Sequence, residues 1–355
     1  MSQIVELEIT ALAFGGEGIA RHEGQVVFIP FTAPGDRVRA KITQKHKKFL
    51  RAEPLEFLLR GPGREIPPCP YFGTCGGCQY QHLEYDTELY WKTRQLRDAL
   101  ERIARLPGLP IDPIVRSPEA YGYRNRITLH LADDKIGFRD LGGRAVVDVK
   151  ECLLADPEVN GELWKIRQSP PPRDRWTIRS SGVEGHAFYQ ANRFLLEALR
   201  TTVSTQLPPA PVLIEGYAGV GFFTEQVAGR YQRVVMIEND ARAASVAEAK
   251  NLPHTTVLTG RCEDWFQHAW NTARGEEGAV CLVDPPREGL EESMTRILLE
   301  LPFRRIAYLS CNPATLARDL GRLSSRWQPV KLTPFDLFPR TAHIECLAVL
   351  DPAGA

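Results

Sequence analysis

The sequence lacks both a long apolar run and a surplus of charge of either sign. Its 355 residues include 44 Lys and Arg and 44 Asp and Glu, so the formal net charge is +0 at pH 7. This balance excludes a protein that binds polyanions through its overall charge, and any phosphate-binding surface has to be local. No segment approaches the roughly 20 apolar residues of a transmembrane helix, and the first residues do not resemble a signal peptide. We expect a cytoplasmic protein with no membrane partner, and we infer no obligate protein partner.

Nothing in the sequence points to secretion, so disulfide bonds are not expected among the eight cysteines. Three of them, Cys262, Cys281 and Cys346, lie in or beside apolar runs and are expected to be small core residues. The composition is that of a globular chain, with 43% hydrophobic and 25% charged residues. A chain of this length can bury two or three separate cores.

Cys311 has a different setting, because it follows the apolar run Ile306–Leu309, which predicts a buried parallel strand. Asp284 directly follows another apolar run, Cys281–Val283, and Glu345 directly precedes a third. Open α/β sheets carry their chemistry at the carboxyl ends of their strands. We therefore expect a thiol nucleophile and two acids to converge at one edge of a sheet.

A possible cofactor pocket lies earlier in the chain. The apolar strand Val212–Glu215 runs into a glycine-rich bend that contains Gly219 and Gly221, and a helix is expected over Phe222–Ala228. Glycines at such a bend let the backbone approach a ligand beside the helix start. Glu238 ends the next strand, where an acid can accept hydrogen bonds from ribose hydroxyls. The third glycine of the dinucleotide fingerprint is missing, so we predict S-adenosylmethionine rather than a nicotinamide cofactor.

Several motifs of this chain occur in the same order in a known family. In that order they are Phe188-Tyr-Gln190-Ala-Asn192, Asp284-Pro-Pro-Arg287, Ser310-Cys-Asn-Pro313 with Thr315–Asp319, and Phe338-Pro through His343-Ile-Glu345. With them the chain resembles the RNA (uracil-5-)-methyltransferases, in particular the branch that acts on 23S ribosomal RNA and contains an iron-sulfur cluster. The resemblance covers most of the chain from Phe188 onward.

The resemblance implies a covalent mechanism. The Cys311 thiolate attacks C6 of uracil, C5 takes the methyl group from S-adenosylmethionine, and Glu345 removes the C5 proton so that Cys311 is eliminated. Asp284 would hydrogen-bond the flipped base and lie beside the sulfonium, and Gln190, Tyr217 and Glu238 would contact the cofactor. The target base has to leave its helix or loop to be reached. The product would be 5-methyluridine.

The sequence departs from the family pattern at a few positions. The strand and bend read Glu215-Gly-Tyr-Ala-Gly, where an Asp and a Cys-Gly are usual, and Phe222 replaces a small polar residue. Arg340 stands at a position that is often His or Gln. The first two differences affect the expected cofactor contacts in detail, and none of them affects the expected nucleophile or base.

A second set of cysteines precedes the catalytic half. Cys69, Cys75 and Cys78 have the spacing C-x5-C-x2-C, and neighbouring glycines allow the loop to curl so that several sulfurs face one centre. A cuboidal cluster needs a fourth thiolate, and the family pattern assigns it to Cys152. The resemblance thus implies a [4Fe-4S] cluster, while zinc is an alternative occupant for such soft ligands. The spacing is not that of radical enzymes.

The N-terminal region predicts a small β-barrel, because short strands recur at regular spacing with glycine turns between them. It resembles the TRAM domain, an oligonucleotide-binding type of barrel. A basic hairpin tip carries Lys45, Lys47, Lys48 and Arg51, which we expect to bind RNA phosphates. Alternatively this tip is only a solvated loop, and the RNA surface lies around Arg124 and Arg126.

We predict a multidomain α/β protein with RNA as its partner. Its expected parts are a TRAM-like barrel over residues 1–58, a small α+β central domain with the cysteines over 59–185, and a Rossmann-like methyltransferase over 186–355. A helix over 85–105 and a hairpin joining 135–139 to 145–148 are expected in the central part. Three other functions stay open: a tRNA uracil-5 methyltransferase, an RNA cytosine-5 methyltransferase, and an RNA-binding module with an inactive core.

Overall fold

The computed structural model describes residues 3–181 and 190–354, without the side chain of Glu276. The chain forms two compact units, each built from separate stretches of sequence. Unit 1 contains residues 1–95, 119–180 and 338–343, and unit 2 contains residues 96–118, 181–337 and 344–355. Among the described residues, no helix has the length and apolar character needed to span a membrane.

The first sheet of unit 1 has six strands in the order β1-β5-β6-β4-β3-β2. Their bounds are β1 Ile4–Glu8, β2 Ala11–Leu12, β3 Gly18–His22, β4 Gln25–Ile29, β5 Arg37–Lys45 and β6 Phe49–Leu59. The backbone N–H of Thr10, just after β1, donates to the carbonyl of Ile19 in β3 at 2.8 Å, which closes the sheet on itself. The predicted N-terminal barrel is thus confirmed, and alternate residues such as Val38 and Ala40 fill its interior.

The second sheet of unit 1 has the order β10-β7-β8-β9. The strands are β7 Arg126–Ala132, β8 Lys135–Arg139, β9 Val146–Asp148 and β10 Arg175–Arg179. Helix α2 (Pro157–Gln168) packs on the sheet through Val159 and Leu163. It begins at Pro157 because Asp156 caps it, accepting from the N–H of Val159 at 2.8 Å. The predicted hairpin is confirmed by the antiparallel pairing of β8 with β9.

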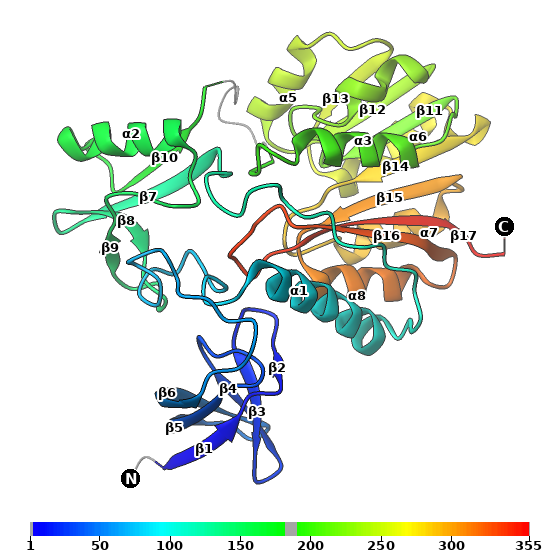
Figure 1. The fold of residues 1–355 in the computed structure, drawn as a ribbon. Coiled ribbons are helices and arrows are strands. Elements are labelled where there is room, and N and C mark those ends of the chain that lie inside the picture. Colours follow the sequence, from blue (N-terminus) through cyan, green and yellow to red (C-terminus); the bar gives the residue numbers. More distant parts are fainter. Residues whose placement is uncertain (1–2, 182–189, 355) are drawn as a thin grey trace. The chain divides into compact units, whose positions relative to one another are not determined.

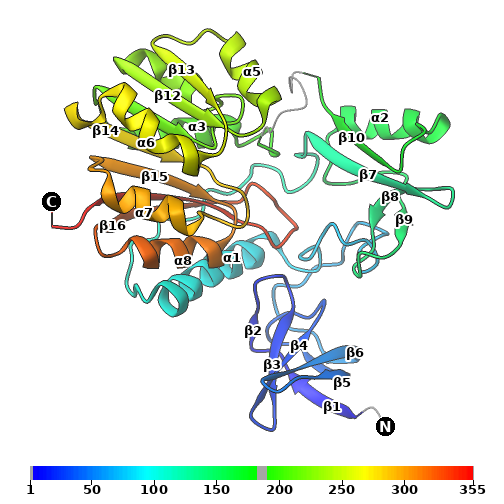
Figure 2. The same ribbon diagram turned by 180° about the vertical axis from the view of Figure 1, so that it is seen from behind.

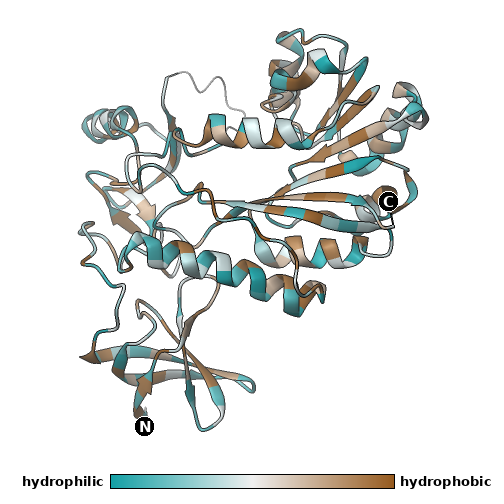
Figure 3. Ribbon diagram, turned by 45° about the vertical axis from the view of Figure 1, so that its right-hand side comes forward, coloured by the Kyte–Doolittle hydropathy of each residue, from teal (hydrophilic) through white to brown (hydrophobic). Residues whose placement is uncertain are grey.

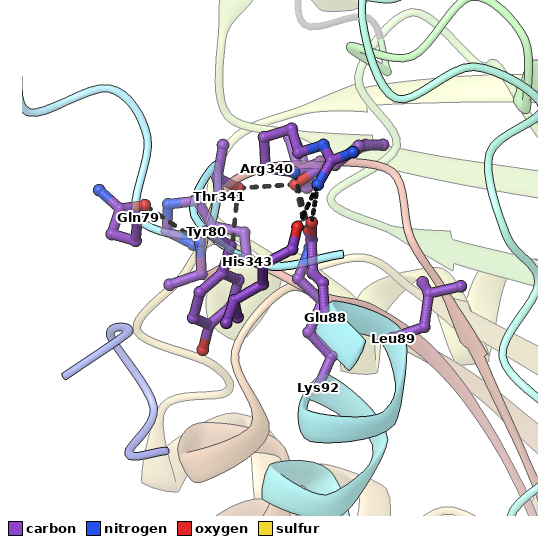
Figure 4. Close-up of polar contacts among 12 residues, drawn as sticks. Gln79, Tyr80, Glu88, Leu89, Lys92, Arg340, Thr341 and His343 are labelled. Carbon is purple, nitrogen blue, oxygen red and sulfur yellow. Dashed lines mark hydrogen bonds and ion pairs between the residues drawn. The ribbon is translucent and has the colours of Figure 1, made fainter. Parts of the chain in front are cut away.

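Residues 338–343 belong to unit 1 although they come late in the chain. Arg340 is 5% exposed, and its guanidinium lies 3.0 Å from the carboxylate of Glu65. Its backbone N–H donates to Glu88 at 2.8 Å, and Glu88 pairs with Lys92 at 2.7 Å, with both side chains of that pair fully buried. Figure 4 shows the Arg340 guanidinium directed toward Glu88. Buried charges of opposite sign therefore hold this segment in place.

Helix α1 (Tyr85–Ala99) continues into a π-helical turn, Leu100–Ala104, which confirms the helix predicted over 85–105. The boundary between the units falls inside α1, after Gln95.

Unit 2 is built on a seven-stranded sheet with the order β13-β12-β11-β14-β15-β17-β16. The strands are β11 Val212–Gly216, β12 Arg233–Glu238, β13 Thr255–Thr259, β14 Ala279–Val283, β15 Arg305–Ser310, β16 Trp327–Phe335 and β17 Glu345–Pro352. β11 to β15 are parallel to one another, while β17 runs antiparallel to both β15 and β16. The order reverses between β11 and β14, and ligands of open α/β sheets bind at such a reversal.

Helices cover both faces of this sheet. They are α3 Leu196–Gln206, α4 Thr224–Val227, α5 Ala241–Ala249, α6 Cys262–Ala273, α7 Glu292–Glu300 and α8 Pro313–Leu323. α3 lies on the face turned toward the viewer in Figure 1, and α6 and α7 lie on the face seen from behind in Figure 2. Figure 3 shows both hydrophilic and hydrophobic residues along these helices, as expected for elements with one buried side. Cys262, Cys281 and Cys346 are buried core residues, as predicted.

Candidate active site

The sheet of unit 2 brings the predicted nucleophile and acids to one edge. Asp284 follows the last residue of β14, and Cys311 follows the last residue of the neighbouring parallel strand β15. β17 starts at Glu345 and runs in the opposite direction, so its first residue lies at that same edge. Ser310 pairs with Cys346, and the next position of this antiparallel register places Cys311 opposite Glu345. Residues separated by 34 positions thus meet through simple strand pairing.

The thiol of Cys311 is partly exposed, and its electrostatic surroundings are dominated by acids. Burial, together with the nearby carboxylates of Glu345 and Asp284, raises the pKa of Cys311 to about 12. The guanidinium of Arg287 acts in the opposite direction and lowers this pKa. A thiol has to become a thiolate to act as a nucleophile. The site therefore needs positive charge, and Arg287 is a cation that supplies some of it.

Glu345 is buried, and Asp284 is half-buried. Glu345 is 3% exposed, and burial raises its pKa well above the usual range, with the charge of Asp284 adding to the effect. Its Oε1 atom is buried with no hydrogen-bond partner among the described residues. Burial also raises the pKa of Asp284 to about 7. Gln190 donates from Nε2 to Asp284 at 3.3 Å. An acid with an unmade hydrogen bond, held beside a second acid, is suited to accept a proton or to face a cationic ligand.

The bend after β11 has the geometry of a ligand cradle. Tyr217, Gly219 and Gly221 all have positive φ, at 59°, 56° and 77°. A Cβ atom on Gly221 would come within 2.8 Å of Cε of Met236, so the backbone there leaves no room for a side chain. The N–H of Gly219 donates to Glu238 at 2.7 Å, which ties the bend to the end of β12. These four predicted cofactor residues are therefore neighbours, and they fit a nucleoside group lying on exposed backbone.

The same bend also reaches the acids. The N–H of Asp284 donates to the carbonyl of Gly216 at 3.4 Å. The side chain of Tyr217 is directed elsewhere, because its hydroxyl donates to Glu263 at 2.8 Å and its backbone N–H donates to the sulfur of Cys262 at 3.1 Å. The cradle and the acid pair thus share one edge, as a methyl donor and an acceptor base would require.

Sequence reasoning assigned no role to two residues of this site, Glu215 and Arg287. Glu215 is 1% exposed and accepts a hydrogen bond from Thr224. Burial raises its pKa to about 8, and the charge of Asp284 contributes to that increase. Glu215 was visible only as a departure from the family pattern, while Arg287 stands in the same four-residue motif as Asp284. Phe188 and Tyr189, which belong to the motif of Gln190, lie outside the described residues.

The four predicted metal-binding cysteines lie together in unit 1. Cys69, Cys75, Cys78 and Cys152 line one cavity of about 260 Å³. Burial raises the pKa of Cys78 to about 12, and the charges of the three other thiols also act on it. The sulfurs are therefore close enough to repel one another as thiolates. In the described part of the chain, their arrangement does not constitute a ready-made metal-binding group.

The predicted RNA-binding residues fall into two sets within unit 1. Lys45, Lys47 and Lys48 are exposed at the tip between β5 and β6. Arg51 is more engaged than these lysines, since it pairs with Glu17. The alternative pair, Arg124 and Arg126, lines the same cavity as the cysteines. Burial lowers the pKa of Arg126, and the neighbouring Arg179 and Arg124 lower it further.

Comparisons with known proteins agree with this combination of barrel and sheet. The TRAM domain family matches residues 2–55, and the family described as tRNA (Uracil-5-)-methyltransferase matches residues 277–352. The tRNA (uracil(54)-C(5))-methyltransferase of Schizosaccharomyces pombe is 31% identical over 414 residues, which cover 98% of this chain and 78% of that protein. The chain belongs to the RNA (uracil-5-)-methyltransferase family. It is thus an enzyme of the class that uses S-adenosylmethionine to methylate C5 of uracil in RNA.

Other RNA (uracil-5-)-methyltransferases match over nearly the whole chain. The 23S rRNA (uracil(1939)-C(5))-methyltransferase RlmD of Stenotrophomonas maltophilia is 29% identical, covering 98% of this chain and 97% of that protein. The crystal structure of Pyrococcus abyssi tRNA (uracil-54, C5)-methyltransferase with S-adenosyl-L-homocysteine has a TM-score of 0.71 and 23% identity, covering 99% of this chain and 100% of that one. It shares the fold. The predicted N-terminal TRAM domain and C-terminal methyltransferase fold are confirmed.

Proposed function

We propose that this enzyme methylates uracil through a covalent bond between Cys311 and C6 of the base. The Cys311 thiolate forms the S–C6 bond, and the resulting enolate carries its electron pair at C5. Bound S-adenosylmethionine supplies the methyl group that C5 accepts. Glu345 then takes the C5 proton, the C5–C6 double bond re-forms, and the S–C6 bond breaks to return the thiolate. Asp284 would hold the base by a hydrogen bond.

The observation that carries this proposal is the meeting of Cys311 and Glu345 across paired strands, next to Asp284. A thiolate is both a good nucleophile and a good leaving group near neutral pH. The buried, unsatisfied Oε1 of Glu345 is available to accept a proton. A sulfonium placed beside these acids would favour their ionised forms. The proposed cofactor contacts are Gln190, Tyr217, Gly219, Gly221 and Glu238, together with Asp284.

The test uses RNA that carries 5-fluorouridine at the target position. Its C5 has no removable proton, so enzyme, methyl group and RNA should stay joined on a denaturing gel. Cys311→Ala should form no such adduct. Cys281→Ala is the matched control, because it removes a fully buried thiol in the middle of β14, and it should still form the adduct. An adduct with Cys311→Ala would overturn the proposal.

We propose 23S ribosomal RNA as the target class, giving 5-methyluridine. Support comes from the TRAM barrel together with the four convergent cysteines, and from the relative RlmD, which is named for 23S rRNA. The relative from Schizosaccharomyces pombe is named for a tRNA position, so tRNA is the competing target. Mass-spectrometric mapping of 5-methyluridine in both RNAs from a deletion strain separates the two. Loss from tRNA alone would refute the ribosomal assignment.

We also propose that Cys69, Cys75, Cys78 and Cys152 hold a [4Fe-4S] cluster in the central domain. The supporting observation is that four soft ligands from two distant segments face one cavity of about 260 Å³. Protein purified without oxygen should be brown and contain iron and sulfide in equal amounts. Cys75→Ser should lose this colour and Cys281→Ala should keep it. Finding zinc in place of iron in the purified protein would refute the [4Fe-4S] proposal.

We propose that the chain has three functional domains, residues 1–58, 59–185 and 186–355. RNA phosphates would lie along the barrel tip at Lys45, Lys47, Lys48 and Arg51, with Arg124 and Arg126 as the second surface.

A further inference from the structure

This inference rests on the proposed role of Cys311 and concerns what holds the nucleophile's surroundings in place. The loop after Asp284 and the first turn of α8 are joined through one carbonyl group. The carbonyl of Arg287 accepts from Nδ2 of Asn312 at 3.3 Å and from Oγ1 of Thr315 at 3.2 Å. Asn312 also caps α8, accepting from the N–H of Ala314 at 3.0 Å. The residue after Cys311 is therefore tied to the loop that carries Arg287.

A buried carboxylate lies behind this junction. Asp319 on α8 is 0% exposed and accepts hydrogen bonds from three different segments. The hydroxyl of Tyr308 in β15 donates to it at 2.8 Å, as does the N–H of Leu290 in the loop. Nε of Arg318 donates to its other oxygen at 2.8 Å. Tyr308 precedes Cys311 by three residues, so this single acid joins the strand, the loop and the helix that surround the nucleophile.

Arg318 extends the connection to the loop backbone. Its guanidinium donates to the carbonyl of Glu288 at 2.8 Å and to the carbonyl of Leu290 at 3.1 Å. Between these carbonyls, Gly289 has a φ of +74°, and a Cβ there would lie 2.5 Å from the Asp319 carboxylate. The loop thus passes so close to Asp319 and Arg318 that only glycine fits. A planar guanidinium can bond two carbonyls and a carboxylate at once, which an ammonium cannot do with the same geometry.

The charged groups around Cys311 link the position of the loop to the reactivity of the thiol. Three charged groups act on the thiol from the elements around it: Glu345 from β17, Asp284 from the end of β14, and Arg287 from the loop. The two acids oppose the thiolate, and Arg287 favours it. A charge–charge interaction weakens as the separation grows. The reactivity of Cys311 therefore depends on how firmly the loop holds Arg287 beside it.

We propose that Arg318 and Asp319 are positioning residues for the nucleophile. Arg318 fixes the loop of residues 284–290 on α8 by its two carbonyl contacts, and Asp319 holds Arg318, Leu290 and Tyr308 in one arrangement. Neither residue takes part in bond making. Their role is to keep Arg287 next to Cys311 so that the thiolate forms.

The experiment compares Arg318→Gln with Arg322→Gln. Arg322 is a matched control, because it lies 3.6 Å from the same Asp319 oxygen and has a similar exposed fraction, 37% against 36%. Among the described residues, Arg322 makes no hydrogen bond to the loop of residues 284–290. The rate at which iodoacetamide alkylates Cys311 in the protein without RNA is measured by peptide mass spectrometry at fixed pH values at which the protein stays folded. Steady-state kinetics and S-adenosylmethionine affinity are measured alongside.

Arg318→Gln should lower the rate of Cys311 alkylation roughly tenfold at a fixed pH, the change produced by a rise of about one unit in the pKa, which is the scale of the effect of a nearby opposite charge. It should lower kcat by on the order of 10²-fold, as expected for a small displacement of reacting groups. S-adenosylmethionine affinity should not change. Arg318→Lys should recover part of the loss, and Arg322→Gln should match the wild type in both measurements.

Equal alkylation profiles for Arg318→Gln and Arg322→Gln would overturn the positioning role, even if both variants were less stable. The proposed function has its own separate outcome, because it fails only if Cys311→Ala still forms the adduct with 5-fluorouridine RNA. A fall in kcat without a fall in the alkylation rate would also refute the inference, since it would mean that Arg318 affects a later step.

Discussion

Buried charge is arranged in two contrasting ways in the two units. In unit 1, Glu88 and Lys92 are fully buried as an ion pair, and Arg340 contributes a second cation. In unit 2, the buried Glu345 and the half-buried Asp284 lie near the thiol of Cys311, so that groups of one sign are concentrated. The first arrangement cancels its charge within the protein. The second is only partly offset by Arg287, and it is suited to a positively charged ligand or to a proton in transit.

The difference distinguishes buried charges that stabilise the fold from charges that take part in the reaction. A buried ion pair loses its hydration and regains stability only when both partners are present. Two neighbouring acids do not stabilise each other's charge: burial raises the pKa of Glu345 well above its usual range, and the charge of Asp284 adds to the effect. Such an arrangement costs stability, and active sites are where proteins retain it. The comparison therefore locates the chemistry in unit 2 independently of any motif.

The largest effect should come from Glu345→Gln, which removes the proposed base while keeping the shape of its side chain. Loss of a general base lowers turnover by roughly 10²–10⁴-fold. Because attack and methyl transfer precede proton removal in the proposed mechanism, a covalent complex with unmodified RNA should accumulate. A denaturing gel detects it. Full turnover by this variant would remove Glu345 from the mechanism.

The edge of the sheet that carries the site was predictable from sequence. Apolar runs that end at Val283 and Leu309 mark buried strands, and the polar residue after each run lies at the strand's carboxyl end. β14 and β15 confirm these strands. Local pattern is sufficient here, because hydrophobic periodicity and strand direction determine which residues share an edge.

The long-range hydrogen bonds of the buried acids Asp319 and Glu88 were not predictable in this way. The N–H of Leu290 bonds Asp319 across 29 positions, and the N–H of Arg340 bonds Glu88 across 252. Neither acid has a neighbour in sequence that marks it as buried. These contacts exist only after the strands have paired. The sequence therefore shows that Arg340 differs from the family pattern, but it does not show that Arg340 contacts Glu88.

The second largest effect concerns the buried pair of unit 1. Lys92→Met should cost about 3 kcal/mol of unfolding free energy, because it leaves Glu88 buried without its closest cation. Adding Glu88→Gln should recover much of this loss. Denaturant unfolding followed by hydrogen exchange in unit 1 measures both.

Lys165→Met is the control for that prediction. Lys165 pairs with Glu162 at 2.6 Å, but the side chains are 67% and 42% exposed. An exposed pair of this kind contributes less than about 1 kcal/mol. Equal losses for the buried and exposed pairs would mean that burial does not distinguish them.

A third, smaller effect should appear in the pH dependence of stability. Burial raises the pKa of Glu215 to about 8, whereas an unfolded Glu titrates near pH 4. A raised folded pKa stabilises the fold below the unfolded pKa, and this contribution is lost as the pH rises through about 8. Between the unfolded pKa near 4 and the folded pKa of about 8, Glu215 should therefore lower the free energy of unfolding by about 1.4 kcal/mol per pH unit. Hydrogen exchange of β11 and β14 between pH 5 and 8 reports it, and Glu215→Gln should make the slope shallower. An unchanged slope would show that Glu215 is already ionised in the folded protein.

The smallest effect concerns charges that are not buried at all. If Lys45, Lys47 and Lys48 contact RNA phosphates, each loss should reduce the slope of log affinity against log salt by roughly 0.7 to 0.9. Arg51→Gln should change this slope less, because Arg51 already pairs with Glu17 and lies 5.9 Å from the ring centre of Phe28. A salt titration of RNA binding compares the three lysine variants with Arg51→Gln, and S-adenosylmethionine affinity should stay constant throughout. Parallel slopes for all variants and the wild type would show that the tip is a solvated loop. In that case the RNA surface has to be sought at Arg124 and Arg126, where Arg124→Gln and Arg126→Gln should then carry the salt dependence.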